Sequence, residues 1–222
     1  FSLAWSGFVR AGAHPLREVN SSRTSQAADQ WLYGVQGGVA WRGADRSSLR
    51  LDVGYFDFHN IEGQLNAATP ASNTRFNESA PSFRQRGNTM FNIAALSDPA
   101  ADPVYGLASK FQVLSVNAGY EFARFDPFRV ALDVNYIKNL GYDRDEILNR
   151  IGAIAAAGIP ADQSGASGID RRARTQGYRF ELRLGHADTD ERGRWQVFSG
   201  YRRLERDATV DGFTSADYRL GG

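Results

Sequence analysis

Residues 30–42 have the sequence QWLYGVQGGVAWR, and this stretch decides the fold class. Its even positions hold mostly small or polar side chains. Its odd positions hold mostly large apolar ones, namely Trp31, Tyr33, Val35, Val39 and Trp41. Successive side chains of a β-strand point to opposite faces, so this period of two predicts a strand with two unlike faces.

Other segments of the chain repeat the alternation. A weaker segment runs through Leu3, Trp5 and Val9, and one more strand is expected to begin at Tyr218 and Leu220. The well-defined segments are Leu49–Tyr55, Leu114–Phe122, Phe128–Tyr136, Tyr178–Leu184 and Trp195–Tyr201. With their flanks they run for about 11 to 13 residues, which fits membrane strands of about 9 to 11 better than the 5 or 6 typical of soluble proteins. We therefore expect seven strands and the start of an eighth.

The connections between these segments alternate in length. Short turns are expected at residues 42–47, 124–128 and 186–193, and long polar segments at 11–29, 59–109 and 139–175. This alternation predicts an all-β antiparallel meander with short turns at one end and long loops at the other. An outer-membrane β-barrel has short periplasmic turns and long extracellular loops, here 59–109 and 139–175. A soluble β-sandwich is the alternative, which the strand lengths disfavour.

Aromatic residues gather near the ends of the segments. Amphipathic rings at both borders of an apolar band are typical of the interfacial girdles of transmembrane barrels. The predicted girdle comprises Trp31, Trp41, Tyr55, Tyr120, Phe122, Phe128, Tyr136, Tyr178 and Trp195.

The alternate positions predict a pore lining. In a barrel the apolar face meets lipid and the other face lines the lumen, where charged side chains are hydrated. The predicted pore-lining residues are Arg50, Asp52, Glu121, Arg129, Asp133, Arg179, Glu181, Arg183 and Arg202. They either set charge selectivity, with a weak lean towards anions, or pair across strands and hold the wall together.

The composition argues against several classes of protein. The 222 residues carry a net charge of +1 and contain no cysteine, which argues against nucleic-acid binding and excludes disulfides and thiolate chemistry. The mean hydropathy of −0.44, with no long apolar run, excludes a transmembrane helix.

The long loops hold further signals. Segment 59–109 carries many apolar residues, so it either folds into the lumen and narrows the pore or forms an extracellular cap. In the other loop, Asp143 or Asp145 is expected to cap a helix that ends at Gly158. Its predicted apolar stripe is Ile147, Leu148, Ile151 and Ile154.

No sequence motif supports catalysis. His14, His59 and His186 lie far apart in the sequence, and no motif of a nucleophile elbow, zinc protease or phosphate-binding loop occurs. Carboxylates at residues 188–191 and 143–146 could hold a divalent ion, but Asp in short turns usually serves the backbone. We therefore expect no enzyme activity, no cofactor and no metal.

Four motifs resemble those of the bacterial putative porin family. They are GYFDFHNIEGQ at residues 54–64, GLASKF at 106–111, NLGYDR at 139–144 and DGFT at 211–214. The resemblance implies an outer-membrane porin that is trimeric, admits small hydrophilic solutes and supplies no catalytic residues. Because such barrels have an even number of strands, we expect residues 1–222 to be one segment of a larger barrel.

The sequence thus predicts a channel for passive diffusion of small hydrophilic solutes or ions. We expect it in the outer membrane of a Gram-negative bacterium, in contact with lipid and lipopolysaccharide, as a homotrimer and without nucleic acid. The alternative is a plugged or gated transporter or receptor barrel, and an outer-membrane barrel enzyme comes after it.

Overall fold

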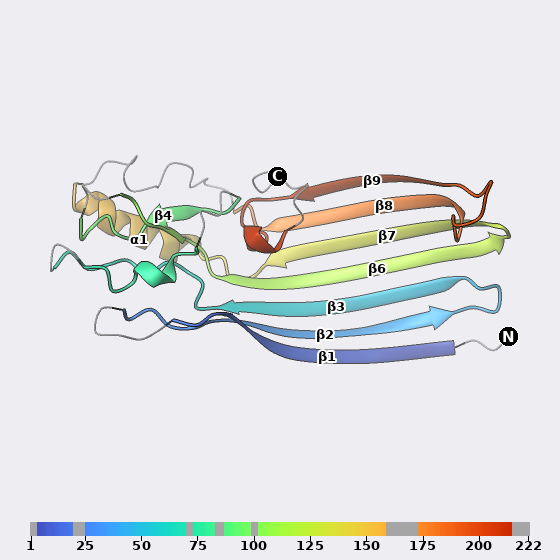
Figure 1. The fold of residues 1–222 in the computed structure, drawn as a ribbon, viewed down its shortest axis with the longest axis horizontal. Helices are drawn as coiled ribbons and strands as arrows, with labels where there is room; N and C mark the ends of the chain where they lie inside the picture. The colour runs from blue at the N-terminus through green and yellow to red at the C-terminus, as the bar shows by residue number, and fades with distance from the viewer. Residues whose placement is uncertain are drawn as a thin grey trace.

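Seven long strands form one antiparallel sheet in the computed structural model of the chain, which describes residues 4–19, 25–69, 73–82, 87–98, 102–158 and 173–214 (Figure 1). The strands are β1 (Ala4–Arg17), β2 (Gln30–Arg42), β3 (Ser48–His59), β6 (Phe111–Phe125), β7 (Phe128–Asn139), β8 (Gln176–His186) and β9 (Gln196–Leu204). Their order in the sheet is β1-β2-β3-β6-β7-β8-β9, so each strand pairs with the next long strand of the sequence.

The ends of the sheet differ as the connection lengths predict. Short turns join β2 to β3, β6 to β7 and β8 to β9 at one end, and the longer segments gather at the other (Figure 1). We call these the turn end and the loop end. The sheet is open, since β1 and β9 each have one neighbouring strand among the described residues.

The first strand is longer than the sequence predicts. We expected a polar loop from Ala11 to Asp29, but β1 continues to Arg17 and pairs with β2 from Ala4↔Arg42 to Arg17↔Gln30. Small residues at positions 11–13 give no visible alternation, and pairing with β2 supplies the order instead. Pro15 is tolerated because β1 is an edge strand in the described sheet. The strand expected to begin at Tyr218 and Leu220 lies outside the described residues.

A packed group of segments lies at the loop end. It consists of the described residues between β3 and β6, the helix α1 (Arg144–Ala156), and residues 205–214, and we call it the loop assembly. It also contains two short strands, β4 (Met90–Asn92) and β5 (Tyr105–Leu107), and two 3₁₀ turns, η1 (Asn77–Ser79) and η2 (Asp211–Phe213). No helix in the described part of the chain is long and apolar enough to cross a membrane.

Helix α1 confirms the predicted helix and its cap. The Asp143 carboxylate accepts hydrogen bonds from the backbone N–H groups of Asp145 and Glu146, at 2.9 and 3.1 Å, which satisfies two otherwise unpaired donors. Of the predicted stripe, Ile147 and Ile154 are buried, while Leu148 is exposed. Leu148 was therefore wrongly assigned to the buried side.

Candidate functional site: the polar face of the sheet

All nine predicted pore-lining residues lie on one face of the sheet, which we call the polar face. The strand register places them across β3 to β9, and some are direct neighbours, such as Asp133 and Glu181 on β7 and β8. Members of this set are Arg50, Asp52, Glu121, Arg129, Asp133, Arg179, Glu181, Arg183 and Arg202. The opposite face carries the apolar positions, and we call it the apolar face.

Three carboxylates on β6 to β8 form ion pairs with arginines. Glu121 pairs with Arg129. Asp133 pairs with Arg183. Glu181 pairs with Arg179, and its Oε1 also lies 3.4 Å from Nε of Arg183. Glu121–Arg129 and Asp133–Arg183 therefore link neighbouring strands, whereas Glu181 pairs within β8.

Amide side chains continue this network towards β2. Oδ1 of Asp52 accepts hydrogen bonds from Nε2 of Gln36 at 2.8 Å and from Nδ2 of Asn117 at 2.6 Å. Asn135 in turn donates to Oδ1 of Asn117 at 2.6 Å. The Asp52 residue itself is buried, at 8% exposure. Our list of pore-lining residues omitted these amides because only charged residues were selected.

Three arginines on the first three strands have a different environment. Arg10, Arg42 and Arg50 are exposed on the polar face, and within the described part of the chain no carboxylate lies at ion-pair distance from them. The Arg10 guanidinium lies 4.9 Å from the ring centre of Phe8. Sequence analysis missed Arg10, whose place in the strand pattern was not recognised, and placed Arg42 beside a turn.

Two glycines of the polar face allow close approach between neighbouring strands. A Cβ on Gly38 would lie 2.7 Å from the Cβ of Asp52 and equally close to the ring of Phe8. A Cβ on Gly119 would lie 2.9 Å from Oδ1 of Asp133. Larger residues at these positions would displace the polar side chains that form the hollows.

The polar face contains two adjoining hollows of about 530 and 470 Å³. Arg50, Asp133 and Arg183 line both, so the hollows form one charged surface along the middle strands. Arg10 lines the second hollow, and Arg42 lines the first, nearer the turn end.

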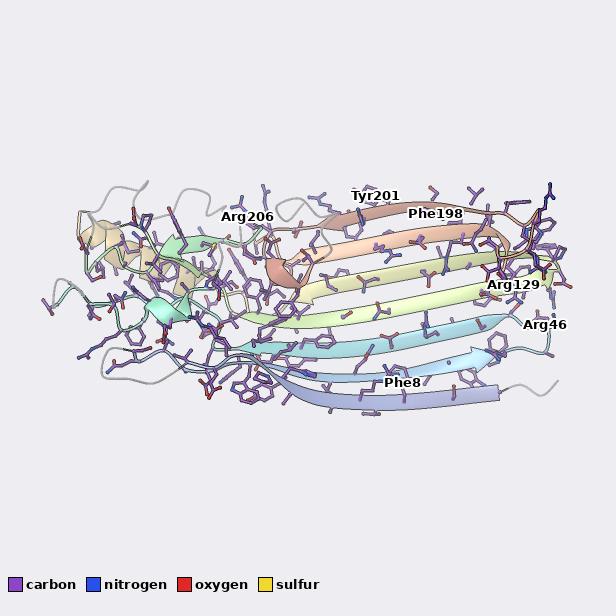
Figure 2. The ribbon with its side chains drawn as sticks, viewed as in Figure 1. Phe8, Arg46, Arg129, Phe198, Tyr201 and Arg206 are labelled. Atoms are coloured by element: carbon purple, nitrogen blue, oxygen red, sulfur yellow. The ribbon has the colours of Figure 1, made fainter. Side chains whose placement is uncertain are left out.

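The predicted girdle residues form two bands at opposite ends of the apolar face. The turn-end band holds Trp41, Tyr120, Phe122, Phe128 and Trp195, and the loop-end band holds Trp31, Tyr55, Tyr136 and Tyr178. Sequence analysis missed further members in both bands. Trp5 has its ring centre 6.5 Å from that of Trp41, and Tyr201 has its ring centre 5.9 Å from that of Tyr178. Figure 2 labels Tyr201 on β9.

Between these bands the apolar face stays open to its surroundings. Large side chains there are 38–50% exposed on the inner strands, including Val35, Val53, Val116, Leu132, Phe180 and Leu182. No described segment covers them. An exposed apolar surface of this extent marks a site of contact with another protein or with a membrane.

The loop assembly meets the polar face at the loop end. Phe58 on β3 and Phe111 and Val113 on β6 share the face of Asp52 and Asn117, and they pack in one cluster with Ile61 and Leu107 of the loop assembly. At the loop end the polar face is therefore covered by apolar side chains, whereas nearer the turn end it is open and charged.

One buried carboxylate ties the loop assembly together. Asp207 accepts hydrogen bonds from the backbone N–H and the hydroxyl of Thr89, at 2.8 and 2.6 Å. Its backbone carbonyl accepts one from Nδ2 of Asn139, at 3.0 Å. Because burial penalises the charged form, the pKa of Asp207 lies above its usual value even though the Thr89 hydrogen bonds act in the opposite direction.

The histidines and the carboxylates of the turns do not converge on a site. His14, His59 and His186 lie on three different strands, and His186 lies at the turn end, where its Nδ1 is 3.2 Å from the backbone N of Trp195. Asp188 accepts from the backbone N–H of Asp190 at 2.9 Å, which is a turn contact. In the described residues no three His, Asp or Glu side chains are grouped to hold a metal ion.

Comparison with known protein families gives a match over nearly the whole chain. A family model described as "Putative porin" matches residues 2–222, nearly the whole chain. No curated protein and no solved structure matches the chain.

Proposed function

Since the chain belongs to the Putative porin family, we propose that it forms part of the wall of an outer-membrane channel for passive diffusion of small hydrophilic solutes and ions. The observation that carries this proposal is the contrast between the two faces of the sheet. One face is apolar, exposed and bordered by aromatic bands, and the other bears ion pairs and exposed arginines. A lipid-facing and a water-facing surface require this contrast.

We further propose that the open sheet is completed into a closed β-barrel. Unpaired backbone groups at the edges of β1 and β9 cannot face hydrocarbon, so a membrane-spanning sheet needs partners for both strands. Residues 1–222 then form one segment of the wall, with the loop end outside the cell. The aromatic bands support contacts with lipid and lipopolysaccharide at the two membrane borders. A homotrimer remains part of the proposal, by analogy with porins.

The proposed role is transport without a chemical step. Three carboxylates of the polar face pair with arginines of the same or the neighbouring strand, and the three histidines lie apart. These arrangements suit a charged wall rather than a catalytic group.

A gated channel is the second candidate. It is favoured by the loop assembly, which packs through Ile61 and Leu107 against the polar face at the loop end. A covering at that place would narrow the entrance, and movement of the covering would regulate flow.

Single-channel conductance of the full-length protein in a planar bilayer tests the proposal. We expect steady ohmic steps from an open channel, and three equal closing steps from a trimer. Folded protein is identified by a gel mobility that changes on boiling. If this folded protein never conducts, the proposal of a passive channel is overturned. Conductance that appears only in brief openings would favour the gated candidate.

A further inference from the structure

Arginines outnumber carboxylates on the polar face. The carboxylates there are Asp52, Glu121, Asp133 and Glu181, and the arginines are Arg10, Arg42, Arg50, Arg129, Arg179, Arg183 and Arg202. The ion pairs described above lie on β6 to β8. The excess positive charge is therefore concentrated towards β1, β2 and β3.

Arg42, Arg50 and Arg10 lie at successive heights along the strands. Through the register, Arg50 is level with Ala40, and Arg10 is level with Gln36. At about 3.4 Å per residue, the step from Arg42 to Arg50 is about 7 Å and the step from Arg50 to Arg10 about 14 Å. We call these three residues the arginine ladder.

The acidic residue nearest to this ladder is partly shielded. Asp52 lies level with Gly38, between the heights of Arg50 and Arg10. Its Oδ1 accepts from both Gln36 and Asn117, and only 8% of the residue is exposed. The guanidinium groups of the ladder, in contrast, are exposed to the hollows and hold no carboxylate partner in the described residues.

We propose that the arginine ladder provides successive contact points for small oxyanions, carboxylates or phosphate, and makes the channel prefer anions to cations. A guanidinium group presents a planar fork of donors that matches both oxyanions. Spaced contacts let an anion pass from one arginine to the next without being trapped. This inference rests on the proposed function and names the class of solute that the channel favours.

The test is the permeability ratio of chloride to potassium, from the reversal potential of the full-length channel in a potassium chloride gradient. We expect a ratio above one in the wild type at low salt, where screening is weakest. A variant carrying Arg10→Gln, Arg42→Gln and Arg50→Gln should lower the ratio about two- to fivefold, as expected for loss of unit charges a few ångströms from the path. Potassium acetate and potassium phosphate in place of chloride identify which oxyanion depends more on the ladder.

Arg203→Gln is the matched control. Arg203 is an exposed arginine on the apolar-face side of β9, level with Tyr178, so its loss should leave the ratio unchanged. Arg50→Lys keeps the charge and should keep the preference. If Arg50→Lys lowers the ratio as much as Arg50→Gln does, Arg50 acts on the shape of the wall, and the charge ladder is wrong.

The outcomes separate this inference from the proposed function. A folded protein without conductance overturns the channel itself. The arginine ladder is wrong if the wild-type channel conducts with a chloride-to-potassium permeability ratio of one or below. It is also wrong if the triple variant does not change this ratio. Neither result contradicts the proposed channel. If the triple variant fails to fold, the permeability ratio of each single Arg→Gln variant is compared with that of the wild type instead.

Discussion

The loop assembly and the long sheet are built for different surroundings. In the loop assembly, Phe91, Ile93, Ile147 and Ile154 are at most 1% exposed and form a core such as water-soluble domains have. In the sheet, large apolar side chains such as Val53 and Val116 stay exposed on one face while the charged ones line the other. The same chain thus turns its apolar groups inward where water surrounds it and outward where lipid is proposed to surround it.

The difference teaches where each region gains its stability. The loop assembly depends on removing apolar surface from water, whereas the apolar face of the sheet leaves large side chains of its inner strands 38–50% exposed and gains less from burial within the chain. Cavities should therefore harm the loop assembly most, and charges on the apolar face should harm the sheet most. The three predictions below test this contrast, from the largest expected effect to the smallest.

Phe91→Ala should destabilise the loop assembly by about 3–5 kcal/mol, because it removes a fully buried ring from the core. Amide hydrogen exchange, compared with wild type, should show lost protection in β4, β5 and α1 and retained protection in β2, β3, β6 and β7. Leu148→Ala is the control, because Leu148 is exposed on α1 and its loss should change stability little. Equal loss of protection in the long strands would show that the two regions unfold as one.

Val116→Arg should cost the sheet about 2–4 kcal/mol in a bilayer, since it places a charge at the middle of the apolar face. The matched variant is Ser115→Arg, one residue earlier in β6 and on the polar face, which should cost much less. Denaturant unfolding of protein inserted into lipid vesicles measures both. Equal costs for the two variants would break the assignment of lipid-facing and water-facing sides.

Asp207→Ala should weaken the loop assembly by about 1–3 kcal/mol, because the buried N–H of Thr89 loses its acceptor. Asp207→Asn keeps an acceptor oxygen without the charge and should cost less. Hydrogen exchange at the amides of the loop assembly gives both values. If the Ala and Asn variants behave alike, the hydrogen bonds of Asp207 contribute little.

The same carboxyl predicts a pH dependence. Because its pKa is higher in the folded protein than the ordinary 3.8, the folded state binds more protons, and this group favours folding more as the pH falls from neutral towards 3.8. Wild type should therefore gain stability relative to Asp207→Asn as the pH is lowered through that window. A difference between the two proteins that stays constant with pH would contradict the raised pKa.

Much of the sheet could be predicted because its signal is local. The alternation of Trp31 to Trp41 and the positions of turns and long loops appear in consecutive residues, and the structure has the strands β2, β3, β6, β7, β8 and β9 there. The short strands β4 and β5, inside the predicted loop 59–109, were not predicted. The same holds for α1, whose cap Asp143 lies directly before the helix. Residues with the same parity in a strand share a face, so the two faces followed from the pattern.

The contacts of the candidate site could be predicted far less well. Arg183 and Asp133 pair although they are 50 residues apart, and Thr89 and Asp207 bond across 118 residues. Arg10 was missed because Ala11, Gly12 and Ala13 do not alternate, and the strand there is defined by its pairing with β2. Sequence proximity carries no information about which side chains meet across strands.

The sequence by itself determined the alternating strands, their two faces, the lengths of their connections and the capped helix, because each depends on residues close together in the chain. Only the tertiary structure decided which arginines pair with carboxylates, which three have no carboxylate partner among the described residues, and how the loops build a core over the polar face. Those outcomes depend on strand register and on packing between distant segments. Register fixes them because a shift of one residue would turn every side chain of a strand to the other face.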